Sequence, residues 1–399
     1  MFRLNSGQEF ITRAAVDWYY NSNELVFQYT GGPGTGKSVV LNEIITRIGL
    51  DPVTEVAAMS YIGSASIVMR MKGLINAKTA HSWLYDMKET ILRDEFGRPI
   101  MDELYNVPIK VPKFIPNDSL PENIKLIVID EGYTIPLKMK AQIEKFGIKI
   151  LVCGDPGQLP PVNDSPAYLV SGKIYRLTEV MRQSGRDDII YICWRIQNGL
   201  PLLNGYYGNV LVIDKEDLTD DMLLWGDIVI CSKNKTRDYF NNHIRSLLGY
   251  SGKLPQLGEK IVCRKNNWLV GINCNNGSEI NLVNGLIGTV MSQPDISTFD
   301  GKLFSLDFMP DLINVQFNGV RCNYAHMIAD ATNRNKIRNN RYQVGNMFEY
   351  AYAVTSYIAQ GSQWHKVVYI QEHMFPEIQI QLDNVGASRA DQQLIFVKK

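Results

Sequence analysis

The sequence contains no apolar run long enough to cross a lipid bilayer, since no stretch approaches the roughly 20 consecutive apolar residues that a transmembrane helix requires. Its first segment, MFRLNSGQEFITRAAVDWYY, also lacks the charged region followed by an apolar region that is typical of a secretory signal. We therefore expect a cytoplasmic protein with no membrane partner.

Cysteine is scarce and scattered. The six cysteines form no CxxC pair, and no Cys/His spacing is typical of a zinc site. This pattern favours reduced, mostly buried thiols over a metal site. The cysteines are Cys153, Cys193, Cys231, Cys263, Cys274 and Cys322.

An excess of charge of either sign is also lacking. The chain carries 41 Lys and Arg residues against 41 Asp and Glu residues, so the whole molecule has no field that would attract a polyanion. A basic groove on a neutral protein stays compatible with this balance. The 399 residues, 45% of them hydrophobic, allow two to four globular domains, and neither repeats nor low-complexity tracts interrupt them.

What the chain does contain is an alternation of short apolar strands and amphipathic helices. Several of the strands end in polar residues, which indicates a parallel sheet with a site along one edge. The expected strands are 25–30, 53–58, 124–131 and 148–155, and the expected helices are 8–20, 38–48 and 64–73. A strand, a turn and a helix over 227–249, and an α/β segment over 352–372, continue the pattern.

Two stretches break this rhythm. Residues 88–121 are polar and carry a turn signal at Phe96-Gly97-Arg98-Pro99, which predicts a hairpin. Residues 255–344 show short β-like runs rich in Asn and Gly, which predict a small β domain. The basic piece RNKIRNNR (334–341) is open to two interpretations, a linker and a solvated loop. The chain is thus expected to have two α/β cores, each interrupted by an insertion.

A glycine-rich segment fits GxxxxGK[ST] in full, with a strand before it and a helix after it. Its glycines allow backbone N–H groups to surround phosphate oxygens, and the helix dipole favours the same anion. Lys37 is expected to reach the β and γ phosphates, and Ser38 to bind Mg²⁺. The alternative is a glycine loop without function, which the flanking strand and helix disfavour. The segment is Gly31, Gly32, Pro33, Gly34, Thr35, Gly36, Lys37 and Ser38.

Two carboxylates, Asp130 and Glu131, end the apolar strand IKLIVID. Downstream of a phosphate loop, Asp130 is expected to hold Mg²⁺ and Glu131 to orient and deprotonate the attacking water. The next strand ends in GDPGQLPPV (154–162). There Gln158 suits a sensor of the γ-phosphate, although spacing alone does not distinguish this from a proline-rich turn.

Together these motifs resemble the superfamily 1 helicases. GGPGTGKS, VIDE, GDPGQLPPV, LTEVMRQ, YAVTSYIAQGSQW and VGASRA occur in the order typical of that family, and GDxxQLPPV resembles the RecD-like and Dda-like class, superfamily 1B. The resemblance spans nearly the whole chain, from Gln8 to Arg389. A simple P-loop kinase or transporter ATPase would share only the first two motifs.

The resemblance implies roles for individual residues. Gln8 matches the glutamine that recognises adenine, and Gln158 matches the γ-phosphate sensor. Arg182 and Arg389 resemble arginine fingers that reach the γ-phosphate from the second core, where a planar guanidinium suits the developing charge. Gln360 and Gly361 resemble an element that contacts both the nucleotide site and DNA.

For nucleic acid, the resemblance implies backbone contacts that ignore base sequence. The residues expected to bind DNA are Tyr61, Gly63, Thr79, His81, Phe96 and Thr355. Of these, Phe96 would be a wedge that splits base pairs. The aromatic side chains near these motifs, among them Trp83 and Tyr357, could stack on bases or simply pack in the core.

The resemblance also implies an architecture. The expected fold is α/β, with two RecA-like P-loop cores that have parallel sheets and that carry a pin-like hairpin and an SH3-like β domain. The first core would comprise 1–87 and 122–172, the pin-like insertion 88–121, the second core 173–254 and 345–399, and the SH3-like insertion 255–344.

Three positions depart from the family pattern. Ser64 stands where a lysine is usual, Tyr357–Gln363 lose a histidine, a lysine and a glutamate, and Asp383-Asn384 replace an aromatic before VGASRA. These losses predict weaker DNA contacts and a shallower salt dependence of binding.

The expected function is an ATP- and Mg²⁺-dependent helicase that moves 5′-to-3′ on single-stranded DNA and acts on forked duplexes, in a bacterial or phage-infected cell. A monomer is expected, with a single-strand-binding or replisome protein as a further partner. The alternatives are a translocase that displaces proteins or remodels forks, an RNA helicase, and a nucleotide-switched loading module.

Overall fold

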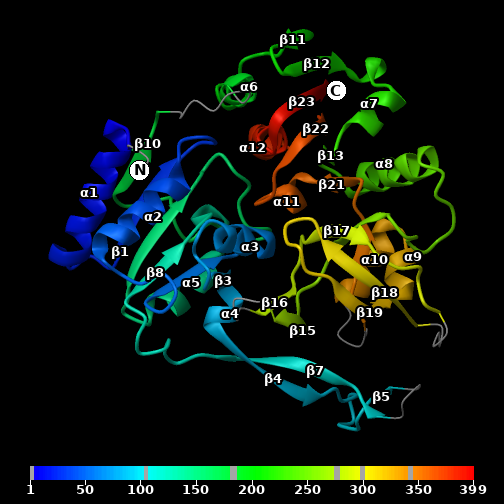
Figure 1. Cartoon of the computed structure of the whole chain (residues 1–399), viewed down its shortest axis with the longest axis horizontal. Helices are drawn as coiled ribbons and strands as arrows, with labels where there is room; N and C mark the ends of the chain where they lie inside the picture. The colour runs from blue at the N-terminus through cyan, green and yellow to red at the C-terminus, as the bar shows by residue number, and fades with distance from the viewer. Residues whose placement is uncertain (1–3, 103–106, 180–186, 274–278, 297–301, 340–344) are drawn as a thin grey trace. The chain divides into compact units, whose positions relative to one another are not determined.

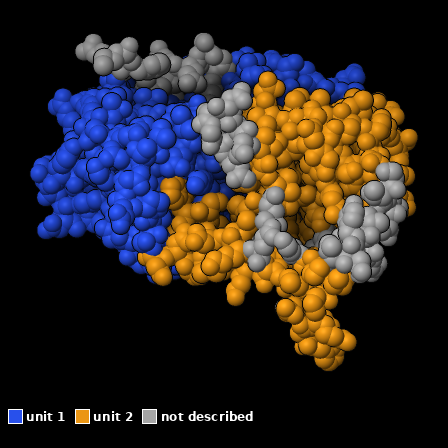
Figure 2. All heavy atoms as spheres, turned by 60° about the horizontal axis from the view of Figure 1, so that its bottom comes forward, with its two compact units in different colours: residues 1–80, 119–240, 353–399 blue, residues 81–118, 241–352 orange. Residues whose placement is uncertain are grey.

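The computed structural model describes residues 4–102, 107–179, 187–273, 279–296, 302–339 and 345–399. Figure 1 shows the helices and strands of the chain, and Figure 2 distinguishes two compact units by colour. Unit 1 comprises residues 1–80, 119–240 and 353–399, and unit 2 comprises residues 81–118 and 241–352. Helix α8 (Asn234–Leu247) runs from one unit into the other.

Unit 1 contains a first, wholly parallel sheet with the order β10-β1-β9-β8-β2-β3. Parallel pairing directs the carboxyl ends of all these strands to one edge, so the loops that carry the predicted motifs meet there. The strands are β1 (Val26–Gly31), β2 (Val56–Ser60), β3 (Lys78–Thr79), β8 (Leu126–Ile129), β9 (Lys149–Gly154) and β10 (Ile174–Leu177). The helices between them are α1 (Ser6–Asn21), α2 (Lys37–Ile48), α3 (Gly63–Met71) and α5 (Leu137–Glu144), with a 3₁₀ turn at Gly132–Thr134.

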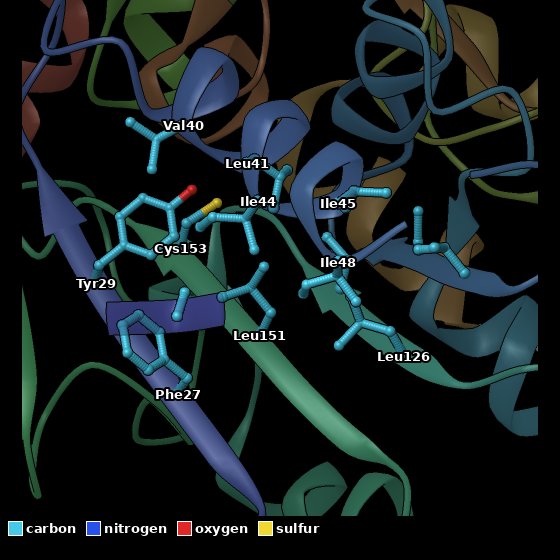
Figure 3. Close-up of a cluster of buried hydrophobic side chains, with 14 of the residues drawn as sticks. Phe27, Tyr29, Val40, Leu41, Ile44, Ile45, Ile48, Leu126, Leu151 and Cys153 are labelled. Carbon is cyan, nitrogen blue, oxygen red and sulfur yellow. The ribbon is translucent and has the colours of Figure 1, made fainter. Parts of the chain in front are cut away.

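Helix α2 is held on this sheet by one apolar stripe. Its residues at helical spacing, Val40, Leu41, Ile44, Ile45 and Ile48, are all buried and meet side chains of β1, β8 and β9 (Figure 3). Burying one such side chain contributes about 1.5–3 kcal/mol, so packing stabilises this helix far more than its intrinsic propensity does. The helix ends at Gly49, which adopts φ 76° and closes the last turn. The phosphate loop is thereby joined to a rigid helix.

Unit 1 also contains a second sheet with the order β11-β12-β23-β22-β13-β21. All neighbours in it are parallel except β11 and β12, which form an antiparallel edge. The strands are β11 (Gly205–Tyr207), β12 (Val210–Asp214), β13 (Ile228–Cys231), β21 (Ala353–Thr355), β22 (Trp364–Ile370) and β23 (Ala390–Lys398). The helices associated with it are α6 (Asp187–Gln197), α7 (Asp220–Trp225), α11 (Ser356–Ala359) and α12 (Pro376–Ala387), with a 3₁₀ turn at Lys215–Asp217.

Unit 2 is built mainly of antiparallel strands. Its larger sheet has the order β19-β18-β17-β14-β20, and β15 pairs with β16 in a separate hairpin. The elements are β14 (Lys260–Cys263), β15 (Asn267–Asn273), β16 (Glu279–Leu282), β17 (Ile287–Val290), β18 (Leu303–Pro310), β19 (Phe317–Asn323), β20 (Phe348–Tyr350), α9 (Tyr324–Ile328) and α10 (Ala331–Asn339). Short antiparallel strands are therefore present where the sequence predicts β-like runs.

The predicted hairpin is present in unit 2 as well. Strand β4 (Tyr85–Ile91) pairs with β7 (Lys110–Pro116) along seven residues, after the short helix α4 (Ala80–Leu84). Short strands β5 (Met101–Asp102) and β6 (Val107–Pro108) extend it. The Nε1 of Trp268 on β15 donates to the Ser82 hydroxyl at 3.1 Å, which ties the base of the hairpin to the β domain within the same unit.

The structure corrects three of the expected boundaries. Residues 173–177 were assigned to the second core, but β10 pairs with β1 in the first sheet. The hairpin starts at Tyr85 rather than at residue 88, since its first residue already pairs with Pro116. The β domain extends past residue 344, because β20 pairs with β14.

The interpretation of 334–341 as a linker or a loop is also wrong for its described part, which is helical. The carboxylate of Asp330 accepts from the backbone N–H of Asn333 at 2.9 Å and so satisfies the first turn of α10. No helix in the described ranges is long and apolar enough to span a membrane. The five cysteines in those ranges are free and buried, as the scattered spacing predicts; Cys274 lies outside them.

Candidate nucleotide-binding and hydrolysis site

The phosphate loop connects β1 to α2 and owes its shape to its glycines. Gly36 adopts φ 81°, a left-handed conformation that side chains disfavour. A Cβ on Gly31 would lie 2.3 Å from the Thr35 hydroxyl oxygen, so no larger residue fits there. Thr35 in turn donates its hydroxyl to the Gly32 carbonyl at 2.9 Å. The loop is thus closed on itself at the amino terminus of a helix, where a phosphate is favoured.

Lys37 and Ser38 lie at the start of α2. The Lys37 ammonium donates to the carbonyls of Gly31 at 2.7 Å and Gly32 at 3.2 Å, so it is folded over the loop. The Ser38 hydroxyl accepts from the Lys72 ammonium at 3.2 Å. Lys72 was not predicted as a site residue, because nothing in its own sequence context marks the C-cap of α3.

Asp130 follows β8 directly and faces the neighbouring strand. Its Oδ1 accepts from the Cys153 thiol at 3.2 Å, and the register of β8 on β9 accounts for this contact because Ile129 is opposite Val152. Burial raises the pKa of the Cys153 thiol well above its usual range, with the Asp130 charge acting in the same direction. A hydroxyl on Ser38 and a carboxylate on Asp130 are oxygen ligands of the kind that Mg²⁺ prefers. No cluster of three or more His, Cys, Asp or Glu side chains suited to a metal occurs in the described ranges.

Glu131 is strained and electrostatically constrained. It adopts φ 54° and ψ 43°, which is rare for a residue other than glycine, and its carbonyl accepts from the Thr134 hydroxyl at 2.7 Å. Burial and then the neighbouring Asp130 charge raise the pKa of the Glu131 carboxyl, while Lys37, Gln158 and Arg389 oppose the shift. A carboxylate with a raised pKa is a stronger base, and it lies beside groups that bind phosphate charge.

Gln158 lies in the turn after β9 and is 5% exposed. Its backbone N–H donates to the Asp155 carbonyl at 3.1 Å, and its side chain interacts with the Glu131 carboxylate. Its side-chain oxygen is buried and has no hydrogen-bond partner in the described part of the protein. An amide held in this way can respond to a group bound beside Glu131.

Arg389 follows α12, on the second sheet of unit 1. Its three nitrogens donate to the Val385 carbonyl at 3.1 Å, the Ser362 carbonyl at 3.3 Å and the Ser388 hydroxyl at 2.9 Å. The side chain is 6% exposed, and its charge acts on Glu131. The second predicted arginine finger, Arg182, lies outside the described residues.

Gln8 is 1% exposed, at the start of α1. Asn5 and Gln8 form a capping box, in which each side chain accepts from the other's backbone N–H. The Gln8 Nε2 donates to the Thr35 carbonyl at 3.1 Å. The side chain therefore contacts the phosphate loop, and its recognition of adenine stays a prediction.

Gln360 and Gly361, predicted to bind nucleotide, lie against α3 and the turn after β9. A Cβ on Gly361 would approach the Cβ of Ala65 to 2.9 Å, and Gly361 has φ 78°. The Gln360 Nε2 donates to the Leu159 carbonyl at 3.2 Å, and the Gln360 carbonyl accepts from the Ser64 hydroxyl at 3.5 Å. Gln360 therefore reaches the turn that carries Gln158, while Gly361 lies against Ala65 of α3, and nucleotide binding by either residue stays a prediction.

The candidate DNA residues are divided between the two units, and their binding of DNA stays a prediction. Tyr61, Gly63, Thr79 and Thr355 belong to unit 1, and His81 and Phe96 belong to unit 2. Thr79 is 4% exposed and Thr355 is 5% exposed, whereas Phe96 is 73% exposed. Of the nearby aromatic residues, Trp83 is buried and Tyr357 packs on Leu159, Leu382 and Val385, so both serve the core.

Comparison with known proteins supports the same class. Residues 3–201, about half of the chain, match the family model described as "AAA domain". An uncharacterized protein of Acanthamoeba polyphaga mimivirus is 24% identical over 299 residues, which cover 63% of this chain and 58% of that protein. The RecBCD enzyme subunit RecD of Buchnera aphidicola is 25% identical over 179 residues, which cover 42% of this chain and 29% of that protein. The chain thus spans less than two thirds of the length of these relatives.

Among solved structures, the Pif1 helicase of Candida albicans shares 16% identity with a TM-score of 0.55, over 100% of this chain and 94% of that chain. A Pif1 helicase of Bacteroides, in complex with ADP-AlF3 and single-stranded DNA, has 16% identity and a TM-score of 0.55, over 99% and 92%. At this identity the likeness establishes a shared fold.

Residues 3–201 therefore resemble an AAA domain, and they hold a phosphate loop and a pair of carboxylates at the carboxyl edge of a parallel sheet. Within that class the chain resembles the RecD-like and Pif1-like helicases of superfamily 1B, as its motifs predict.

Proposed function

We propose that this chain is an ATP-hydrolysing motor that moves 5′-to-3′ along single-stranded DNA and separates duplex strands. ATP and Mg²⁺ are its cofactors, and single-stranded DNA and forked duplexes are its partners. The catalytic residues are Lys37, Glu131, Gln158, Arg182 and Arg389, with Mg²⁺ held by Ser38 and Asp130.

One observation carries the proposal. The pKa of the buried Glu131 carboxyl is lowered by three side chains that come from three parts of unit 1. They are Lys37 from the phosphate loop, Gln158 from the turn after β9, and Arg389 from the second sheet. A base, a sensor and a fixed cation around one point suit the transfer of a γ-phosphoryl group to water. Arg389 and Glu131 lie on different sheets, so hydrolysis depends on the position of the second sheet's elements relative to those of the first. This dependence can drive stepping along the strand.

The domain assignment follows from the same argument. We infer that the second, mostly parallel sheet is a second RecA-like core, since it carries Arg389, whose charge lowers the pKa of the Glu131 carboxyl after the first sheet. The hairpin of unit 2 is proposed as the pin and its antiparallel sheet as the SH3-like insertion. DNA as substrate is supported by the Pif1 structures described with single-stranded DNA and, for two coordinating Pif1 helicases, at forked double-stranded DNA.

The test is ATP-dependent strand separation of two duplexes, one with a 5′ single-stranded tail and one with a 3′ tail, alongside a Lys37→Ala variant. We expect separation of the 5′-tailed duplex alone and none with Lys37→Ala. Separation of only the 3′-tailed duplex would keep the motor and refute the polarity. Hydrolysis that DNA does not stimulate would refute the DNA motor. The assay is then repeated with RNA: stimulation by RNA indicates an RNA helicase, and no stimulation indicates a nucleotide-switched module.

A second candidate is a translocase that displaces proteins or remodels forks with little unwinding. The observation that favours it is Ser64, which stands where the family has a lysine, is fully buried and donates to Gln360. A position expected to contact DNA is used here for packing, so a phosphate contact is lost. Single strands that stimulate hydrolysis without separation of either duplex would select this reading.

A further inference from the structure

The turn that carries Gln158 is held from the second sheet by three side-chain amides. Each amide donates to a backbone carbonyl of the turn, and the three carbonyls lie within four consecutive residues. Gln381 donates to Pro156 at 3.4 Å, Asn384 to Gly157 at 2.9 Å, and Gln360 to Leu159 at 3.2 Å. The carbonyls on both sides of Gln158 are therefore fixed by side chains from α12 and from the residue after α11.

Asn384 is the centre of this arrangement. It is fully buried, and its Oδ1 accepts from the Gln197 Nε2 at 3.1 Å, which orients the amide so that Nδ2 faces Gly157. A Cβ on Gly157 would lie 2.9 Å from the Gln197 Nε2 and 3.3 Å from the Asn384 Nδ2. A larger residue at position 157 would therefore have to displace these amides.

The turn is also fixed by a hydrogen bond of its own and by apolar packing. The Gly157 N–H donates to Asp155 Oδ1 at 2.8 Å, and Leu159 packs against Leu382 and Val385 of α12. These anchors restrict the backbone around Gln158, and the Gln158 side chain interacts with the Glu131 carboxylate. Helix α12 is therefore linked to the Glu131 carboxyl in two ways. Arg389, which follows the helix, affects the pKa of Glu131 through its charge, and Asn384 affects Glu131 through Gln158.

We propose that Asn384 is a positioning residue that presents Gln158 to the hydrolysis site only while α12 is engaged with the 156–159 turn. This inference rests on the proposed function, because it assigns Asn384 a part in ATP hydrolysis. It also gives a role to a position where the chain departs from the family's usual aromatic residue. The role is distinct from packing, since it requires an oriented N–H donor and not merely volume.

The test is a double-mutant cycle between Asn384→Ala and Gln158→Ala, with steady-state ATP hydrolysis measured on single-stranded DNA. We expect Asn384→Ala to lower kcat about tenfold, as loss of one hydrogen bond allows, with KM for ATP nearly unchanged. The double variant should be no slower than Gln158→Ala alone, because Asn384 acts through Gln158. Gln379→Ala is the matched control: it removes an amide bond to Asp383 on the same helix without touching the turn, and kcat should stay within about twofold.

Losses that multiply in the double variant would overturn the inference, as would an unchanged kcat in Asn384→Ala or an equal loss in Gln379→Ala. If Asn384→Ala fails to fold, Gln197→Ala serves instead, since Gln197 is exposed and only orients the Asn384 amide. Gln197→Ala should lower kcat by less than Asn384→Ala does, and it should not lower kcat further in a protein that already carries Gln158→Ala. If the wild-type protein hydrolyses ATP but the effects of the two substitutions are additive, the inference alone is refuted. If the wild-type protein does not hydrolyse ATP, the proposed function is refuted as well.

Discussion

The side-chain Nε2 of Gln8 donates to the carbonyl oxygen of Thr35 in the phosphate loop at 3.1 Å. The other end of the same amide accepts from the Asn5 N–H, so both ends of a buried side chain are engaged by the protein. The counterpart of Gln8 in the helicase family recognises adenine. In this chain the geometry favours a brace for the loop that does not depend on the base.

We therefore expect Gln8→Ala to raise KM for ATP and for GTP by the same factor, about fivefold to tenfold, as for the loss of one hydrogen bond. The measurement is kcat/KM for both nucleotides. Gln28→Ala is the control, because this amide holds Leu169 and Ser171 on the same sheet without contacting the phosphate loop. A loss confined to ATP would show that Gln8 recognises adenine instead.

Glu131→Gln should abolish hydrolysis while stabilising the fold. Removal of a general base is expected to slow turnover by about 10² or more. Because burial and Asp130 raise the pKa of the carboxyl, ionising Glu131 opposes folding, and a neutral amide removes that penalty. The measurements are single-turnover hydrolysis and Tm, with the exposed Glu122→Gln as the control.

The raised pKa of Glu131 also sets how stability and activity depend on pH. With its pKa raised in the folded state, Glu131 binds its proton more tightly there than in the unfolded chain, so stability falls as pH rises from the ordinary carboxyl pKa through the raised one. Activity follows the opposite direction, since only the ionised form accepts a proton from water. The Tm difference between Glu131→Gln and wild type should therefore shrink at acid pH; a constant difference would contradict this account.

The parts of the site that could be predicted from sequence are those whose chemistry is local. The phosphate loop, Asp130 and Glu131 occupy contiguous motifs next to apolar strands, and the parallel sheet brings them to one edge without further information. The same holds for most strands and helices of the first sheet, because α2 and β8 show their apolar pattern directly.

The remainder depends on pairing between distant segments. Strand β10 has a mixed pattern of burial, and only its register with β1 assigns it to the first sheet. Asn384 differs from the family pattern, so no motif could indicate that its amide reaches Gly157. Cys153 likewise becomes a neighbour of Asp130 only through the pairing of β8 with β9.

Arg389→Lys should lower kcat by about 10² or more and leave ATP binding almost unchanged. The guanidinium donates to the carbonyls of Val385 and Ser362 and to the Ser388 hydroxyl, and an ammonium cannot reproduce this planar fork. The measurements are kcat and the affinity for a non-hydrolysable nucleotide. Arg195→Lys is the control, since Arg195 bonds Tyr191 and Pro201 away from Glu131. A kcat within a few-fold of wild type would remove Arg389 from the catalytic residues.

Phe96→Ala should abolish duplex separation and spare hydrolysis on single strands. Phe96 is 73% exposed at the tip of the hairpin, where Asp94 accepts from the backbone N–H groups of Phe96 and Arg98 at 2.9 Å each. The turn is thus shaped by Asp94, and loss of the ring should change the free energy of unfolding by less than about 0.5 kcal/mol.

The control for this prediction is Phe375→Ala, which removes an equally exposed ring, 75% exposed, at the N-cap of α12 in unit 1. Both variants are compared in strand separation of a 5′-tailed duplex and in hydrolysis on an unpaired strand. If an exposed aromatic ring at the hairpin tip wedges between base pairs, only Phe96→Ala uncouples the two activities. Normal separation by Phe96→Ala, or an equal defect in Phe375→Ala, would show that the hairpin splits the duplex without its aromatic tip.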